Sequence, residues 1–180
     1  MYRPIVLLAL LAPAQPLVAQ AASDSTPLQR SVAQLRGAVG RWAVTTEFLN
    51  EDGSVARSAD GTYDFAWVIP DRVVSGRSDI PALGRAAGLL FYVNETDQTI
   101  EMVSVGPDGR LWVMTGPLGG ETRYTQEYAT PDGGKGQLRF TRYNVTPDAF
   151  DSRMEYTSDG GTTWTPGNHQ RFTRVASPDR

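Results

Sequence analysis

The fold is decided by residues 40–49, which read Gly-Arg-Trp-Ala-Val-Thr-Thr-Glu-Phe-Leu. Successive side chains of a β-strand point to opposite faces of a sheet, and every second residue from Trp42 onward is large or branched. One face of the segment therefore carries side chains suited to a protein interior, namely Trp42, Val44, Thr46 and Phe48. The pattern predicts a strand with one buried face.

Similar short runs continue along the chain, separated by Gly, Asp, Asn and Pro. The predicted strands are residues 41–49, 62–69, 73–80, 89–93, 99–105, 111–115, 122–129, 137–144, 149–157 and 170–175. Their connections leave little room for crossover helices, so neighbouring strands are expected to pair antiparallel. The longest break, residues 81–87, is expected to form a loop at one mouth of a barrel. The sequence thus predicts an all-β fold, an antiparallel up-and-down β-barrel of eight to ten strands, with a β-sandwich as the alternative.

Residues 27–39 precede the first strand and follow a different period. Leu28, Val32, Leu35 and Val39 are spaced as on one face of an amphipathic helix. The sequence therefore predicts one short helix before the barrel.

The N-terminus has the features of a secretory signal. Arg3 gives a positive start, residues 4–12 are apolar, and Ala19-Gln20-Ala21 provides the small-x-small pattern of a cleavage site. The apolar run is shorter than the ~20 residues that span a bilayer. We expect cleavage after Ala21 and a periplasmic or secreted location. The expected division is a signal peptide at 1–21, a spacer and helix start at 22–34, the barrel domain at 35–175 and a tail at 176–180.

Composition narrows the class of function. The net charge is −3 and no long basic run is present, so we expect no nucleic-acid partner. The absence of cysteine excludes disulfides, thiolate metal sites and a cysteine nucleophile. A single histidine, His169, excludes a zinc site built from several histidines. We therefore expect no metal, no cofactor and no membrane span in the mature chain.

The segment Gly40-Arg41-Trp42 follows the predicted helix and opens the first strand. It resembles the G-x-W pattern of lipocalins and their relatives, the calycins. Gly61-Thr62-Tyr63-Asp64, and Ser158-Asp159-Gly160-Gly161 before Trp164, extend the resemblance to a bacterial exported lipocalin-like domain family of unknown function. It covers residues 35–175. It implies that Trp42 closes one end of the barrel and packs against an arginine of the last strand, for which Arg171 and Arg174 are the matching residues.

Two features of the sequence are also found in proteins with specific activities. Residues 157–164 fit the Asp-box of sialidase-type propellers, but propellers carry several copies, so we interpret this single copy as a hairpin turn. His169, at the start of the last predicted strand, would suit haem iron in a small barrel. The extended glycine motif of haem-binding barrels is absent after Trp42, which favours an ordinary hydrogen-bonded histidine.

A small apolar or amphipathic molecule is the predicted ligand, held in an aromatic-lined cavity. The candidate lining residues are Tyr63, Phe65, Trp67, Trp112 and Tyr143, and the candidate polar anchors are Arg77, Arg139 and Arg153. A buried arginine can hold a carboxylate through two parallel hydrogen bonds. The alternative for these arginines is an outward position in cross-strand ion pairs, since antiparallel sheets usually place charges outside. Arg142 is expected on the face of its strand opposite Arg139.

Two other classes of function are compatible with the sequence. One is a cyclase, isomerase or hydrolase that uses a carboxylate in the same cavity, for which no spacing selects a catalytic pair among Asp64, Glu101, Asp148 and Asp151. The other is an interaction protein of the cell envelope with a solid barrel core. The sequence favours a binding protein over an enzyme.

Overall fold

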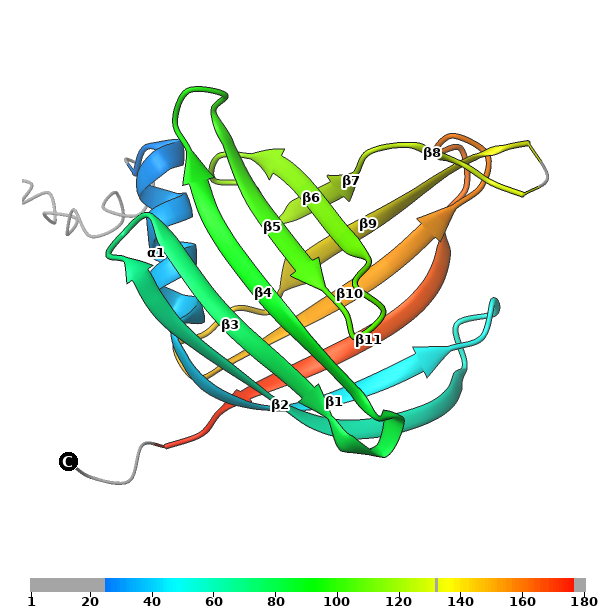
Figure 1. Cartoon of the computed structure of the whole chain (residues 1–180), viewed down its shortest axis with the longest axis horizontal. Coiled ribbons are helices and arrows are strands. Elements are labelled where there is room, and N and C mark those ends of the chain that lie inside the picture. The colour runs from blue at the N-terminus through cyan, green and yellow to red at the C-terminus, as the bar shows by residue number, and fades with distance from the viewer. Residues whose placement is uncertain (1–24, 132, 177–180) are drawn as a thin grey trace, which may run out of the picture.

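The computed structural model describes residues 25–131 and 133–176, which form one antiparallel β-barrel with a helix across one end (Figure 1). The strands are β1 (Gly40–Leu49), β2 (Val55–Ile69), β3 (Val73–Ile80), β4 (Arg85–Asn94), β5 (Thr99–Val105), β6 (Leu111–Pro117), β7 (Thr122–Thr125), β8 (Tyr128–Ala129), β9 (Lys135–Tyr143), β10 (Ala149–Thr157) and β11 (Thr165–Arg174). The predicted signal sequence and its cleavage site lie outside the described residues.

The strands pair in chain order, apart from the two-residue β8, which pairs only with β9. The barrel closes because β9 pairs with β10 and β11 pairs with β1. Ten of the eleven strands of the sheet therefore form a closed up-and-down barrel. This confirms the predicted fold class, a calycin-like barrel with one short N-terminal helix, and the closed order excludes the β-sandwich.

The helix α1 (Pro27–Ala38) begins where the sequence predicts a helix and ends one residue earlier. Thr26 and Gln29 form a capping box, in which each side chain accepts a hydrogen bond from the other residue's backbone N–H. Leu35 is buried, and Ser31 accepts a hydrogen bond from the Gly119 N–H at 2.8 Å. The helix is thus fixed against the barrel end in Figure 1, far from the connection between β3 and β4.

Three strands begin at least four residues earlier than the sequence predicts: β2 at Val55, β4 at Arg85 and β11 at Thr165. These extensions contain glycine, proline or polar residues, so they lack the alternation that marks a strand. Backbone pairing with a neighbouring strand sets their conformation instead. The loop expected at 81–87 is correspondingly shorter. It consists of the 3-10 turn η1 (Pro81–Leu83) and of Gly84 in the left-handed conformation.

The strand predicted at residues 122–129 is two strands, β7 and β8. The break lies at Gln126 and Glu127, which have no strand partner. As a result β6 pairs with β7 only at Met114 and Thr115.

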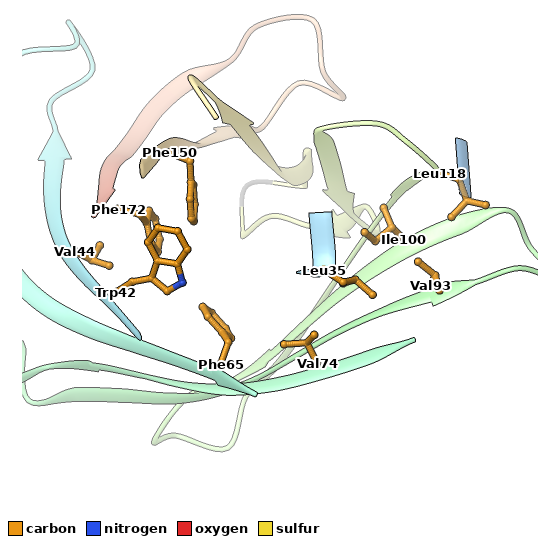
Figure 2. Close-up of a cluster of buried hydrophobic side chains, with 10 residues drawn as sticks. All are labelled: Leu35, Trp42, Val44, Phe65, Val74, Val93, Ile100, Leu118, Phe150 and Phe172. Carbon is orange, nitrogen blue, oxygen red and sulfur yellow. The ribbon is translucent and has the colours of Figure 1, made fainter. Parts of the chain in front are cut away.

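The core lies at the barrel end that α1 covers (Figure 2). The ring of Trp42 packs edge-on against Phe150 at 5.0 Å between ring centroids, and Phe150 stacks on Phe172 at 4.2 Å. Figure 2 shows Leu35 of α1 between this aromatic group and the aliphatic side chains of β3, β4 and β5. The alternating residues of the first strand therefore point inward, as their spacing predicts.

Arg174 confirms the expected partner of Trp42. Its guanidinium carbon lies 4.2 Å from the centroid of the indole. It also donates hydrogen bonds of 2.8 Å to the carbonyl oxygens of Gly37 and Val39 at the end of α1. Trp42 Nε1 donates to the Ala38 carbonyl at 2.8 Å. The last strand thus joins the first strand to the end of the helix.

Candidate functional site

The barrel encloses a cavity of about 290 Å³. Most of its wall is apolar and aromatic, and the lining residues on this wall are Ala38, Phe48, Phe65, Ile80, Leu83, Ala87, Leu89, Phe91, Met102, Phe140, Phe150, Met154 and Phe172. The polar lining residues are Thr46, Tyr63, Ser78, Arg85, Ser104, Arg123, Arg142, Asn168 and Gln170. The cavity runs from the C-terminal turn of α1 to the connection between β3 and β4. Its existence excludes the solid-core alternative.

A row of neutral polar side chains crosses the cavity, and these side chains form hydrogen bonds with one another. Gln170 Nε2 donates to Thr46 Oγ1 at 3.0 Å and to the Tyr63 hydroxyl at 3.1 Å. Ser152 Oγ donates to Gln170 Oε1 at 3.4 Å. Burial raises the pKa of Tyr63, so its hydroxyl stays protonated at neutral pH. These groups position one another and leave little capacity to hold a charged ligand.

Arg142 brings a positive charge into the cavity, but this charge is neutralised. Its Nε donates to Glu121 Oε2 at 2.8 Å and its Nη2 donates to Glu121 Oε1 at 3.0 Å. The guanidinium also lies over the ring of Phe150, at 5.6 Å from the centroid. This two-pronged ion pair is the usual way to bury an arginine in an apolar wall.

Arg123 brings a positive charge that no carboxylate neutralises by direct contact. Its residue is 4 % exposed, and it takes part in none of the ion pairs among the described residues. Its Nη2 donates to Gln34 Oε1 at 2.9 Å, while its Nε has no hydrogen-bond partner among the described residues. Burial lowers the pKa of Arg123 to about 10, which leaves it charged at neutral pH. A buried guanidinium with an unused donor at a cavity wall is suited to an anionic group.

The structure brings two of the predicted lining residues into the cavity wall, Tyr63 and Phe65. Trp67 instead packs against the hydrophobic core. Trp112 lines a second hollow beside the cavity mouth, where the guanidinium of Arg110 lies 4.1 Å from its ring centroid.

The other four predicted site residues lie outside the barrel, so the cavity does not include them. Arg77 pairs with Asp79 and its side chain is 69 % exposed. Arg139 and Arg153 both form ion pairs with Glu155. Arg153 also lies over the ring of Tyr143, the fourth of these residues. They match the outward alternative. The physical reason is the alternation of side chains: alternate residues of each strand point the same way, but the spacing does not say whether that way is in or out.

The inward arginines are the residues that sequence reasoning missed. Arg142 does point to the face opposite Arg139, and that face is the interior. The sequence does contain a signal for the inward position of Arg142, because the aromatic residue Phe140 lies on the same face of the strand. No comparable signal marks Arg123, since its burial depends on the packing of α1 against β7.

The Asp-box-like segment 157–164 and His169 both have structural roles. Asp159 accepts hydrogen bonds from the backbone N–H and the hydroxyl of Thr163 and from the hydroxyl of Thr157, and Gly160 and Gly161 have positive φ. Residues 157–164 therefore form the expected turn. His169 is on the outer face, with Nδ1 3.0 Å from Glu47 Oε2. This position does not suit a ligand inside the barrel.

The cavity wall does not support the alternative of an enzyme that uses a carboxylate in the cavity. No Asp or Glu is among its lining residues. Glu101 is buried, but it accepts hydrogen bonds from the hydroxyls of Thr99 and Thr115 and is not among the lining residues. Within residues 25–131 and 133–176, no three acidic or histidine side chains are grouped as metal ligands. Nor does this part of the chain contain a helix with the length and apolar character needed to cross a membrane.

The fold and the cavity define a class of protein: a calycin-like antiparallel barrel with a hollow, arginine-containing interior. No protein-family model matches the sequence, and a comparison with curated proteins finds no significant similarity. Among the solved structures that match this chain are three that each cover about four fifths of it. The first is a protein of unknown function from the DUF3598 family of Nostoc punctiforme, with 12% identity, a TM-score of 0.45, and 79% of this chain and 49% of that chain covered.

The second is an S-type phycobiliprotein lyase from Guillardia theta, with 13% identity, a TM-score of 0.47, and 81% and 93% of the two chains covered. The third is EF1p2_mFAP2b bound to DFHBI, with 19% identity, a TM-score of 0.38, and 81% and 98% covered. The present chain spans about half of the length of the DUF3598 protein.

Proposed function

We propose that this protein binds an anionic amphiphile inside its barrel, with the acidic head group on Arg123 and the apolar part against the aromatic wall. The observation that carries the proposal is the buried guanidinium of Arg123, which contacts an amide and no carboxylate. Glu101 and Glu121 act on Arg123 electrostatically but form no ion pair with it, and burial of a charge without a directly contacting counter-ion is costly. A ligand carboxylate, sulfonate or phosphate would supply the missing partner through charge-assisted hydrogen bonds.

The charge of the cavity supports an anion over a neutral ligand. Three arginines and no acidic residue line it, although the chain as a whole carries a net charge of −3. Arg142 is already paired, and Arg85 lies at the mouth. The deep positive charge that remains available is that of Arg123. The size of about 290 Å³ is near the lower end of the cavities that hold small ligands, so part of the molecule is expected to extend toward the mouth.

The test is displacement of the fluorescent anion 8-anilinonaphthalene-1-sulfonate from the purified protein by hexadecanoic acid and by hexadecanol. The acid should displace the probe at a concentration at least about tenfold lower than the alcohol, because only the acid forms an ion pair with Arg123. In the variant Arg123→Gln, which keeps a donor for Gln34 but removes the charge, this preference should disappear.

The matched control is Arg153→Gln, which removes a charge from the outer face. It should retain the full preference for the acid. Equal displacement by acid and alcohol in the native protein, or an unchanged preference in Arg123→Gln, would overturn the proposal.

We also propose that the protein works outside the cytoplasm, on the basis of residues 1–21. The test is N-terminal sequencing of the protein recovered from the periplasm or medium. A mature chain that begins at Ala22 is expected, and a cytoplasmic chain that begins at Met1 would contradict the proposal.

A further inference from the structure

A second hollow adjoins the cavity at the end of the barrel away from α1. Its volume is about 530 Å³, and it lies between the start of β4 and the turn that joins β5 to β6. The residues that line both spaces are Ser78, Ile80, Arg85, Ala87 and Ser104. The two spaces therefore share a wall, and we infer that the second hollow is the entrance to the first. We name it the vestibule.

The vestibule carries two arginines without an acidic partner. Neither Arg85 nor Arg110 takes part in the ion pairs among the described residues. Arg110 is positioned by the indole of Trp112, 4.1 Å from its guanidinium carbon to the ring centroid. Asp108 is the one acidic lining residue, and its Oδ1 accepts a hydrogen bond from the Arg110 backbone N–H at 3.1 Å. The vestibule thus has an excess of positive charge, as the deep end of the cavity does.

These two positive regions lie at opposite ends of the barrel wall. Arg85 begins β4, and Val93 near its end is in register with Ile100 of β5, which is in register with Gly116 of β6. Gly116 lies against the side chain of Arg123. The eight residue-to-residue steps from Arg85 to Val93 correspond to about 26 Å along the strand.

The wall between the two regions is largely apolar. The side chains of Leu89 and Phe91 on β4 and of Met102 on β5 face the cavity there. A molecule that spans both regions would therefore have an apolar middle and two polar ends. Its length would approach that of a long-chain lipid, given the separation along β4.

We propose that the ligand carries an acidic group at each end, one on Arg123 and one between Arg85 and Arg110. This inference rests on the proposed function, because it assigns the second end of the ligand that Arg123 binds. The chemical class is a long-chain dianionic amphiphile. Arg123 sets the orientation of the ligand, and the vestibule selects for the second acid.

The experiment compares hexadecanedioic acid with hexadecanoic acid as displacers of 8-anilinonaphthalene-1-sulfonate. The diacid should be about fivefold more potent or better, since exposed charge pairs contribute modestly. The advantage should shrink as salt is added, because the vestibule arginines are open to solvent. Diacids of ten to eighteen carbons form a series in which potency should rise steeply at the length that reaches both regions.

The double variant Arg85→Gln/Arg110→Gln should lose the diacid advantage, so that the two acids displace the probe at the same concentration. Arg77→Gln, on the outer face of β3, is the matched control and should behave as the native protein. Equal potency of the two acids in the native protein, or an advantage that survives in the double variant, would overturn the inference and leave the proposed function intact. If neither acid surpasses hexadecanol, both proposals fail.

Discussion

Arg123 and Gln34 form a contact in which a neutral amide holds a buried guanidinium. Arg123 Nη2 donates to Gln34 Oε1 at 2.9 Å, and Gln34 Nε2 donates to the Gly120 carbonyl at 3.0 Å. The carbonyl can only accept, so it fixes which end of the amide faces the arginine. A carboxylate at residue 34 would neutralise Arg123. The residue that α1 places here therefore leaves a positive charge for a ligand.

Replacement of Gln34 by Glu should abolish the preference for anionic ligands without unfolding the protein. The new carboxylate would pair with Arg123, and this gain offsets the loss of about 1 kcal/mol from the hydrogen bond to Gly120. Displacement by hexadecanoic acid should weaken about tenfold or more. The urea midpoint should change little.

Gln29→Glu is the control for this substitution, because it makes the same charge change on the same helix. Gln29 is exposed, and its side-chain oxygen already accepts a hydrogen bond from the Thr26 N–H, which a carboxylate retains. Affinity should be that of the native protein. A similar loss in both variants would show that net charge, and not the contact with Arg123, governs binding.

Ala87→Trp should block the passage between the vestibule and the cavity. Ala87 lines both spaces, so a large side chain has room to occupy the shared opening. Displacement by either acid should then require at least about tenfold more ligand, while the cost in stability stays near the lower end of the ~1–3 kcal/mol seen for overpacked cores. Leu90→Trp, on the other face of β4, should bind normally. Full binding in Ala87→Trp would place the ligand elsewhere.

Arg174→Lys should destabilise the barrel end that α1 covers. Lysine keeps the charge but loses the planar stack on Trp42 and the paired hydrogen bonds to the end of α1, with an expected cost of about 2 kcal/mol in the free energy of unfolding. Arg171→Lys, on the same strand with a largely exposed side chain, should cost less than about 0.5 kcal/mol. Urea unfolding measures both. Equal stability of the two variants would contradict this role of Arg174.

Asp159 should make stability depend on pH in the acidic range. Hydrogen bonds from Thr157 and Thr163 hold the pKa of this carboxyl well below its usual range. A group with a lowered folded pKa stabilises the protein above its unfolded pKa of about 3.9, and the contribution is lost as pH falls below that value. The melting temperature of Asp159→Asn should be lower than that of the native protein at about pH 6, and the difference should narrow at about pH 3. A difference independent of pH would refute this assignment.

Local patterns predict most of the fold correctly. The strands at 73–80, 99–105 and 149–157 have the predicted bounds, because alternation and turn residues mark both of their ends. The resemblance to lipocalins also allowed the contact between Trp42 and Arg174 to be predicted. The early start of β2 could not be predicted, because the segment from Val55 to Gly61 has no large apolar side chain after Val55 and pairs with β1 through its backbone.

The candidate site was predictable only in its aromatic part. Tyr63 and Phe65 line the cavity because they share an inward face. Arg77 and Arg139 follow the same alternation on strands whose inward face is the other one, so they lie outside. The alternation along each strand was predicted correctly, but it does not show which face of the strand points inward. The predicted polar anchors therefore lie on the outer face.

The spacing of neighbouring residues is enough to predict an antiparallel barrel that begins at residue 40, with a helix before it. Which charges face inward, and which of them lack a partner, depends on how distant segments of the chain pack together. Arg142 and Arg123 both line the cavity, yet Arg142 forms an ion pair with Glu121, whereas Arg123 forms a hydrogen bond with the neutral Gln34. Residues 34 and 123 are distant in the chain, and the packing of α1 against β7 brings them together. The availability of a charge depends on that contact, which no local pattern records.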